Sequence, residues 1–304
     1  MLAHRVHEPP SSAELRSSQG ASRLTQPALG PARGFFAPGY EPVARCFAGL
    51  LEREEIGAGV SIYVRGEHVV DLHGGLADVK QQRPWQKDTR IVVFSATKGL
   101  MAMATHLLAD RGLLEWDAPV AEYWPEFAAN GKAGITVRTL LNHRAGLPYL
   151  DTPLRLDDFL APTHPAHVCA ALESQRPAWT PGTDQGYHAT TYGMYARELF
   201  ARIANEPVGP FLRRELLEPL GSDAFMGTPA SEDPKFATLY NPSLGSRLRK
   251  MLATAITDPD SNEVRILKGT LKRNSIGQKA YRNPKTKGGV FAYNALPVRR
   301  AALA

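Results

Sequence analysis

The hydrophobic pattern near the start of the chain predicts a helix followed by a β-hairpin. Apolar residues between positions 42 and 55 recur at the spacing of one helical face. Two runs typical of strands follow at 57–64 and 67–73, with Arg65-Gly66 between them as a tight turn. We therefore expect one helix and one antiparallel hairpin in the first third of the chain.

The clearest change of pattern lies between residues 91 and 108. A β-branched apolar run at 91–94 is followed by apolar residues at helical spacing over 100–108. Gly112 then provides a typical C-terminal cap. Ser95 therefore stands where extended chain turns into helix, as an N-cap or first-turn residue. A short helix is expected to start at residues 117–120, and further helices are expected near 135–141, 192–203 and 211–220.

Both ends of the chain lack such regular patterns. Residues 1–38 are rich in Ser, Pro, Gly and Arg and are expected to form a flexible tail. Residues 39–240 carry the regular patterns and are expected to form one domain. Residues 241–304 are interpreted as a basic, weakly structured segment of the same domain. This segment shows modest helical spacing near 248–256 and one run typical of a strand at 289–293.

Composition narrows the class of protein. The chain has 304 residues, a formal net charge of +6 and 43% hydrophobic residues, which is typical of a soluble globular protein. No apolar run reaches the ~18 residues that a membrane-spanning helix needs. Cys46 and Cys169 are the only cysteines, and residues 1–26 contain no apolar secretory segment. We therefore expect free thiols in a reducing, cytoplasmic compartment, and no metal or other cofactor.

The basic residues between positions 247 and 300 raise the alternative of nucleic-acid binding. No aromatic platform or helix-turn-helix pattern accompanies the charge, so we interpret the segment as a solvated surface. We expect a small-molecule substrate and neither a nucleic acid nor a membrane as partner. The oligomeric state is left open.

Ser95 and Lys98 form the main candidate for chemistry. Residues three apart share one helix face, so the lysine amine stands one turn from the serine hydroxyl. Packed apolar walls would desolvate the ammonium, and the amine would then take the serine proton. Ser-x-x-Lys also occurs by chance, and a capping serine followed by a solvated lysine is the alternative.

Three other features have both a structural and a functional interpretation. His143 is interpreted as a structural hydrogen-bonding residue in a loop rather than as a catalytic base. Tyr187 precedes a helix, where a tyrosine either faces a cleft or is half-buried in the core. Gly74-Gly75 is interpreted as a turn that ends the second strand. An oxyanion loop of the lipase type is disfavoured, because the chain contains no Gly-x-Ser-x-Gly motif.

Three blocks of sequence resemble a known family as a set. They are Phe94-Ser95-Ala96-Thr97-Lys98-Gly99, Leu140-Leu141-Asn142-His143-Arg144-Ala145-Gly146-Leu147-Pro148, and Trp179-Thr180-Pro181-Gly182-Thr183 with Gly186-Tyr187-His188-Ala189. In order and spacing they are similar to the class C β-lactamase-like serine hydrolases. That family includes esterases, D-aminopeptidases and relatives of penicillin-binding proteins. The resemblance covers about residues 42–240 and implies an α+β fold of the β-lactamase/DD-peptidase type, in which an antiparallel sheet accompanies a mostly helical subdomain.

The resemblance also implies roles for individual residues. Ser95 matches the acylated nucleophile, and Lys98 matches the lysine that helps to deprotonate it. Tyr187 matches the tyrosine that shuttles the proton as general base and acid. The implied activity is hydrolysis through an acyl-enzyme, by a serine hydrolase of the carboxylesterase kind.

Two departures from the family pattern affect this expectation. The family has an asparagine two residues after the tyrosine, and here that residue is Ala189, which favours a simple ester over a β-lactam or peptide. The family also has a third, downstream Lys-Thr-Gly or His-x-Gly motif. We interpret the near match at Lys285-Thr286 as a solvated basic loop, and expect an incomplete sheet in a truncated chain. The alternatives are a catalytically impaired relative, or β-lactamase or D-aminopeptidase activity.

Overall fold

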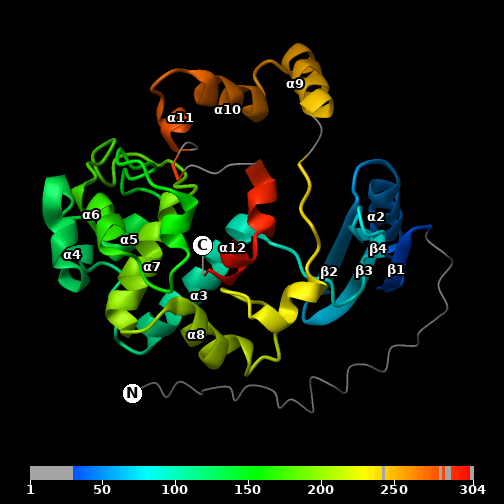
Figure 1. The fold of residues 1–304 in the computed structure, drawn as a ribbon, viewed down its shortest axis with the longest axis horizontal. Helices are drawn as coiled ribbons and strands as arrows, with labels where there is room; N and C mark the ends of the chain where they lie inside the picture. Colours follow the sequence, from blue (N-terminus) through cyan, green and yellow to red (C-terminus); the bar gives the residue numbers. More distant parts are fainter. Residues whose placement is uncertain (1–29, 242–243, 281–282, 285–288, 302–304) are drawn as a thin grey trace. The chain divides into compact units, whose positions relative to one another are not determined.

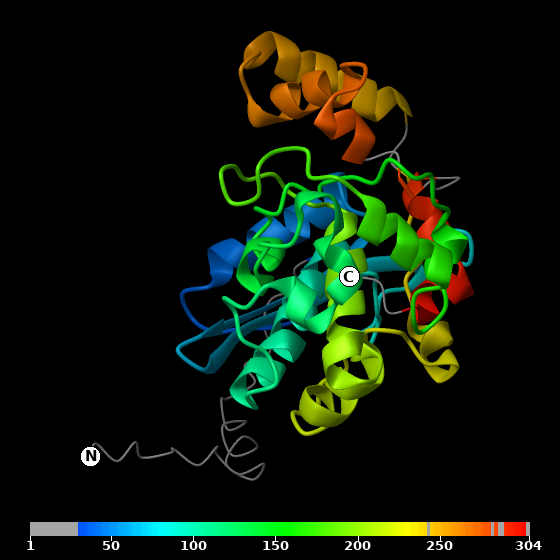
Figure 2. The same ribbon diagram turned by 90° about the vertical axis from the view of Figure 1, so that its left-hand side faces the viewer.

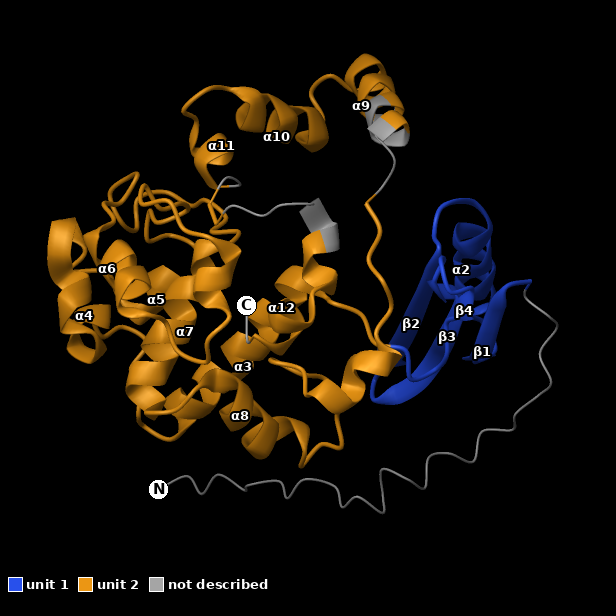
Figure 3. Ribbon diagram, in the orientation of Figure 1, with its two compact units in different colours: residues 1–89 blue, residues 90–304 orange. Residues whose placement is uncertain are grey.

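A computed structural model describes residues 30–241, 244–280, 283–284 and 289–301. Figure 1 shows the ribbon, and Figure 2 shows the same ribbon from the side. The chain divides into two compact units, residues 1–89 and residues 90–304, which are coloured separately in Figure 3. The first unit carries the described sheet and the second is built of helices, so the expected α+β class is confirmed.

The first unit is an antiparallel sheet with one helix. Its elements are β1 (Ala32–Phe36), α2 (Glu41–Arg53), β2 (Gly57–Val64), β3 (Glu67–Asp78) and β4 (Arg83–Pro84). The strand order is β1-β3-β2, and β4 pairs with the far end of β3. Phe47 of α2 and Val70 and Leu72 of β3 belong to one buried apolar cluster. The predicted helix and hairpin are confirmed, including the turn at Arg65-Gly66.

Two predictions for this unit are wrong. Residues 32–36 are not part of a flexible tail, because they pair with β3 from Ala32 opposite Gly74 to Phe36 opposite Val70. The strand is defined by this pairing rather than by the pattern of its own five residues. Gly74-Gly75 is not a turn, because both residues lie inside β3. A Cβ atom on Gly74 would lie 2.3 Å from the Pro31 carbonyl oxygen, so the glycine permits a close approach of backbones.

The second unit is organised around two long helices, α3 (Thr97–Asp110) and α7 (Thr191–Ala204), which contact each other. All ten residues from Thr191 to Phe200 are buried, which makes α7 the central helix of this unit. Shorter elements surround it: α4 (Val120–Tyr123), the 3₁₀ segment η3 (Pro125–Gly131), α5 (Val137–Leu141), α6 (Ala166–Ser174) and α8 (Val208–Leu212), which continues as a π-helical turn over Arg213–Leu217. The helices predicted between residues 100 and 220 are therefore confirmed.

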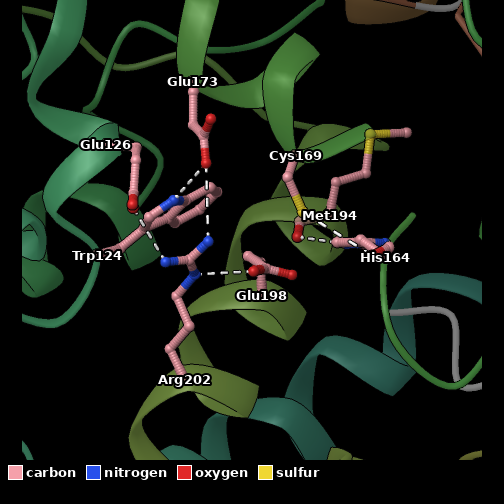
Figure 4. A network of polar contacts seen from close by, with 8 residues as sticks. All are labelled: Trp124, Glu126, His164, Cys169, Glu173, Met194, Glu198 and Arg202. Carbon is pink, nitrogen blue, oxygen red and sulfur yellow. Dashed lines mark hydrogen bonds and ion pairs between the residues drawn. The ribbon is translucent and has the colours of Figure 1, made fainter. Parts of the chain in front are cut away.

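A polar network joins α7 to its neighbours (Figure 4). Arg202 forms ion pairs with Glu198 at 2.8 Å, with Glu126 at 3.0 Å and with Glu173 at 3.7 Å. The indole N–H of Trp124 donates to Glu173 at 2.8 Å, and the Arg202 guanidinium lies 4.9 Å from the Trp124 ring centroid. One arginine on α7 thereby fixes α6 and η3 against it.

Helix continues beyond residue 240, contrary to the expected weak structure. The described elements there are α9 (Leu244–Thr257), α10 (Asn262–Leu271), α11 (Ile276–Ala280), the 3₁₀ segment η7 (Gly289–Asn294) and α12 (Leu296–Arg300). Ser261 caps α10, where its side chain accepts from the Val264 amide, and Val264 is buried. The run at 289–293 forms η7 rather than a strand, because a strand needs a neighbour to pair with and the described strands all precede residue 85.

No helix in the described ranges combines the length and the apolar content that crossing a membrane would require. Both cysteines are free thiols, as the sequence predicts. Burial, reinforced by Glu198, raises the pKa of the Cys169 thiol to about 11.

Candidate active site

Ser95 lies in a short 3₁₀ turn, η2 (Phe94–Ala96), that leads directly into α3. The Ala96 amide donates to the Val93 carbonyl at 3.1 Å, and the Thr97 hydroxyl donates to the Phe94 carbonyl. Phe94 has a φ of +46°, a left-handed conformation that is rare for a bulky residue. The chain thus bends sharply just before the serine, and Ser95 is exposed. Ser95 lies in the turn that leads into α3, as the sequence predicts, although the N-cap of α3 is Ala96.

Lys98 stands in the first turn of α3 and points back toward Ser95. Its ammonium donates to the Ser95 hydroxyl at 3.3 Å and to the backbone carbonyl of Ala189 at 3.0 Å. The ammonium also lies 5.4 Å from the Tyr187 ring centroid and 5.5 Å from that of Tyr192. Burial lowers the pKa of Lys98 below its ordinary value, while the neighbouring Tyr187 acts in the opposite direction.

Tyr187 completes the group from the loop that precedes α7. Its hydroxyl donates to the Ser95 hydroxyl at 2.7 Å, across a sequence separation of 92 residues. The tyrosine side of the site is open, since Tyr187 is 51% exposed. The structure therefore brings Ser95, Lys98 and Tyr187 together, and two hydrogen bonds converge on the serine oxygen. Their roles in a reaction are still predictions.

His143 lies behind Tyr187 in the loop that follows α5. Its Nδ1 accepts a hydrogen bond from the His188 amide at 3.2 Å, which agrees with the interpretation of His143 as a structural hydrogen-bonding residue. Burial and the nearby Lys98 both lower the pKa of His143.

Three neighbours of the site were not singled out from the sequence. Tyr192 faces Lys98 from the first turn of α7, where its spacing indicated only an apolar helix face. The Ala189 carbonyl is a backbone group and leaves no signal in residue type. Tyr293 of η7 packs edge-on against Phe94, with ring centroids 5.2 Å apart. The sequence does not predict this contact, because the pattern of residues 289–293 is typical of a strand.

The remaining predictions concern the third motif and metals. Lys285 and Thr286 lie outside the described residues, so the structure does not test their interpretation as a solvated loop. In the part of the chain that is described, no three His, Cys, Asp or Glu side chains gather as metal ligands.

Comparison with known proteins identifies the family. Residues 43–280 match the model of the Beta-lactamase family, and the chain belongs to that family. The esterase/beta-lactamase LipL of Mycobacterium tuberculosis is 39% identical over 202 residues, which cover 65% of this chain and 45% of LipL. The beta-lactamase of Escherichia coli K12 is 25% identical over 204 residues, 65% of this chain and 51% of that protein. The chain thus spans about half the length of these curated relatives.

Solved structures support the fold. A penicillin-binding protein homolog from Caulobacter crescentus is 36% identical with a TM-score of 0.66, over 70% of this chain and 57% of that one. A family VIII carboxylesterase is 38% identical with a TM-score of 0.64, over 69% of this chain and 57% of that one. The chain therefore has a β-lactamase-like α+β fold, as the sequence resemblance implied.

Proposed function

We propose that this protein is a serine hydrolase that cleaves carboxylic esters through an acyl-enzyme on Ser95. One observation carries the proposal: the Tyr187 hydroxyl and the Lys98 ammonium both donate to the Ser95 oxygen, at 2.7 Å and 3.3 Å. A serine in contact with groups that can accept its proton once they are deprotonated is the arrangement that activates a serine nucleophile. Relatives named as esterases add support.

The proposed reaction has two half-reactions. In the reactive form the Lys98–Tyr187 pair has lost one proton, and the Ser95 oxygen attacks the ester carbonyl carbon while its own proton passes to that pair. Collapse of the tetrahedral intermediate breaks the bond to the alcohol, and the pair returns the proton to the departing alkoxide. Water then repeats these steps on the acyl-enzyme and releases the carboxylic acid. The lowered pKa of Lys98 supports this role, because a neutral amine can accept a proton.

The proposed preference for esters rests on position 189. The side chain there is a methyl group, which offers no amide to the side chain of a β-lactam or to a peptide carbonyl. An ester with a small acyl group needs no such partner. β-Lactam hydrolysis is the second candidate function, because LipL is named both an esterase and a β-lactamase.

The first test is covalent labelling. A fluorophosphonate probe is expected to label the wild-type protein at Ser95, as located by peptide mass spectrometry, and Ser95→Ala is expected to abolish the labelling. Ser61→Ala is the matched control, since Ser61 is also exposed and has a histidine partner, His68, at 2.9 Å. Label on Ser61, or undiminished label in Ser95→Ala, would show that the nucleophile is assigned wrongly.

The second test concerns substrate class. Short-chain p-nitrophenyl esters are expected to give a higher kcat/KM than a chromogenic cephalosporin. The opposite order would replace the esterase proposal with the β-lactamase one.

A further inference from the structure

Two histidines fix the loop that carries Tyr187. The backbone carbonyl of His143 accepts from the Gly186 amide at 3.1 Å, and the His143 Nδ1 accepts from the His188 amide at 3.2 Å. Gly186 and His188 are the two residues on either side of Tyr187. A single residue, His143, therefore holds the backbone both before and after the tyrosine.

The side chain of His188 makes two further contacts with the backbone near Tyr187. Its Nε2 accepts from the Leu147 amide at 2.9 Å, and its Nδ1 lies 2.5 Å from the Gly186 carbonyl oxygen. A backbone amide can only donate, so the His188 Nε2 must carry a lone pair, and its proton must be on Nδ1, facing Gly186. By the same argument the His143 Nδ1 carries a lone pair. Each imidazole therefore acts as an acceptor in its neutral form.

The surroundings favour those neutral forms. Among the described residues, the titratable groups facing His143 are Lys98, Tyr187, Tyr192 and His188, and none of them is a carboxylate. His188 is almost fully buried, with His143 as its titratable neighbour. Among the described residues no carboxylate contributes to either histidine, so a second proton on an imidazole would be unpaired as well as desolvated.

We propose that His143 and His188 are positioning residues, which as neutral imidazoles hold the Tyr187 hydroxyl against Ser95. The proposal rests on the proposed function, since it assigns a purpose to the placement of Tyr187. It does not make His143 a general base, because the His188 amide already occupies the Nδ1 lone pair. The two residues act on the reaction only through the tyrosine between them.

Position 143 offers a matched pair of variants. His143 has a φ of +66°, a left-handed conformation that asparagine tolerates well. In His143→Asn the side-chain oxygen can take the place of Nδ1 and accept from the His188 amide, without a titratable ring. His143→Leu keeps an apolar side chain of similar size but has no acceptor. Both variants lose the ring contacts, and they differ in the hydrogen bond and in the backbone strain that leucine adds at a positive φ.

The experiment combines two readouts on the whole protein. Hydrogen exchange at the His188 amide is expected to be faster in His143→Leu than in wild type, and close to wild type in His143→Asn. Fluorophosphonate labelling of Ser95 is expected to slow on the order of 10- to 100-fold in His143→Leu, because a misplaced proton-carrying group loses most of its effect. His143→Asn is expected to restore most of the labelling rate.

A double-mutant cycle separates positioning from general damage to the structure. In a Tyr187→Phe background, His143→Leu is expected to cause little further loss of labelling rate, since the group it positions is already gone. An equal loss in both backgrounds would overturn the proposal, and so would unchanged exchange at the His188 amide. If wild-type Ser95 is not labelled at all, the proposed function fails and the positioning role fails with it. The exchange data would then still report whether His143 holds the loop.

Discussion

At the scale of single residues, Lys98 is the side chain through which the proposed reaction at Ser95 is best tested. The proposed reaction requires that the lysine is close to the serine and that it exists in part as a neutral amine. Its contact with Ser95 meets the first condition, and the lowering of its pKa by burial favours the second.

Arginine and methionine substitutions at position 98 separate charge from proton transfer. Arginine stays protonated in proteins and cannot act as a base, whereas methionine removes both charge and base. We expect Lys98→Arg and Lys98→Met alike to slow labelling of Ser95 by about 10²- to 10⁴-fold, the usual contribution of general-base catalysis. A Lys98→Arg variant that labels at a near wild-type rate would indicate an electrostatic role instead. Thermal unfolding of each variant is the control for folding.

Substitution of Ala189 tests the basis of the ester preference. Ala189→Asn adds the amide found at this position in the family, without changing the backbone carbonyl that binds Lys98. We expect kcat/KM for a cephalosporin to rise relative to that for p-nitrophenyl acetate, through a lower KM, because the amide offers hydrogen bonds to the β-lactam side chain. Ala189→Val, which adds bulk without an amide, is the control. An equal change in both variants would mean that size alone matters.

At the scale of elements, one buried lysine fixes the end of α6. Lys132 is fully buried, and its ammonium donates to the backbone carbonyls of Ala129, Glu173 and Gln175 at 2.6 to 2.8 Å. Two of these carbonyls belong to the C-terminal end of α6, where carbonyls lack partners within the helix. The three donors of one ammonium therefore join η3 to α6.

Removal of this ammonium is expected to destabilise the protein. In Lys132→Met three backbone carbonyls, including the buried one of Gln175, lose their donor, and we expect the free energy of unfolding to fall by about 2–4 kcal/mol. Urea denaturation measures the change. Lys80→Met, at an exposed position, is the control and should stay within about 0.5 kcal/mol of wild type. A loss below 1 kcal/mol at position 132 would show that water replaces the ammonium.

The elements also show what the sequence could and could not indicate. Ser95 and Lys98 were predictable because both lie on one local helix start, and Tyr187 because it belongs to a recognisable block. His188 was not, because its role depends on the Leu147 amide, which is distant in sequence. The strand β1 and the segment η7 were missed because neighbouring chain, rather than their own pattern, determines their conformation.

At the scale of the whole molecule, two histidines make the free energy of unfolding depend on pH. Burial lowers the pKa of both His188 and His164 to about 4, with Arg197 adding to the effect at His164. In the unfolded chain a histidine takes up its proton near pH 6.5. Between these values the unfolded state binds more protons than the folded state. The stabilisation is therefore fully present above pH 6.5 and is lost as the pH falls toward 4.

This difference predicts acid-induced destabilisation. Each of the two histidines should account for a loss of roughly 3 kcal/mol in the free energy of unfolding between pH 6.5 and 4. Urea denaturation at several pH values measures the total. The variant His164→Leu, which leaves the Tyr187 loop intact, should lose less stability over this range than wild type. If the free energy of unfolding changed equally with pH in both proteins, His164 would not be a source of the pH dependence.

The hydrogen bond from Lys98 to position 189 has an evolutionary consequence. The lysine is held there by a main-chain oxygen, which every amino acid supplies. If the proposed function holds, mutation can exchange the side chain at position 189, and with it the preferred substrate, while this contact of Lys98 is kept. A change of substrate would then not require a new partner for the lysine.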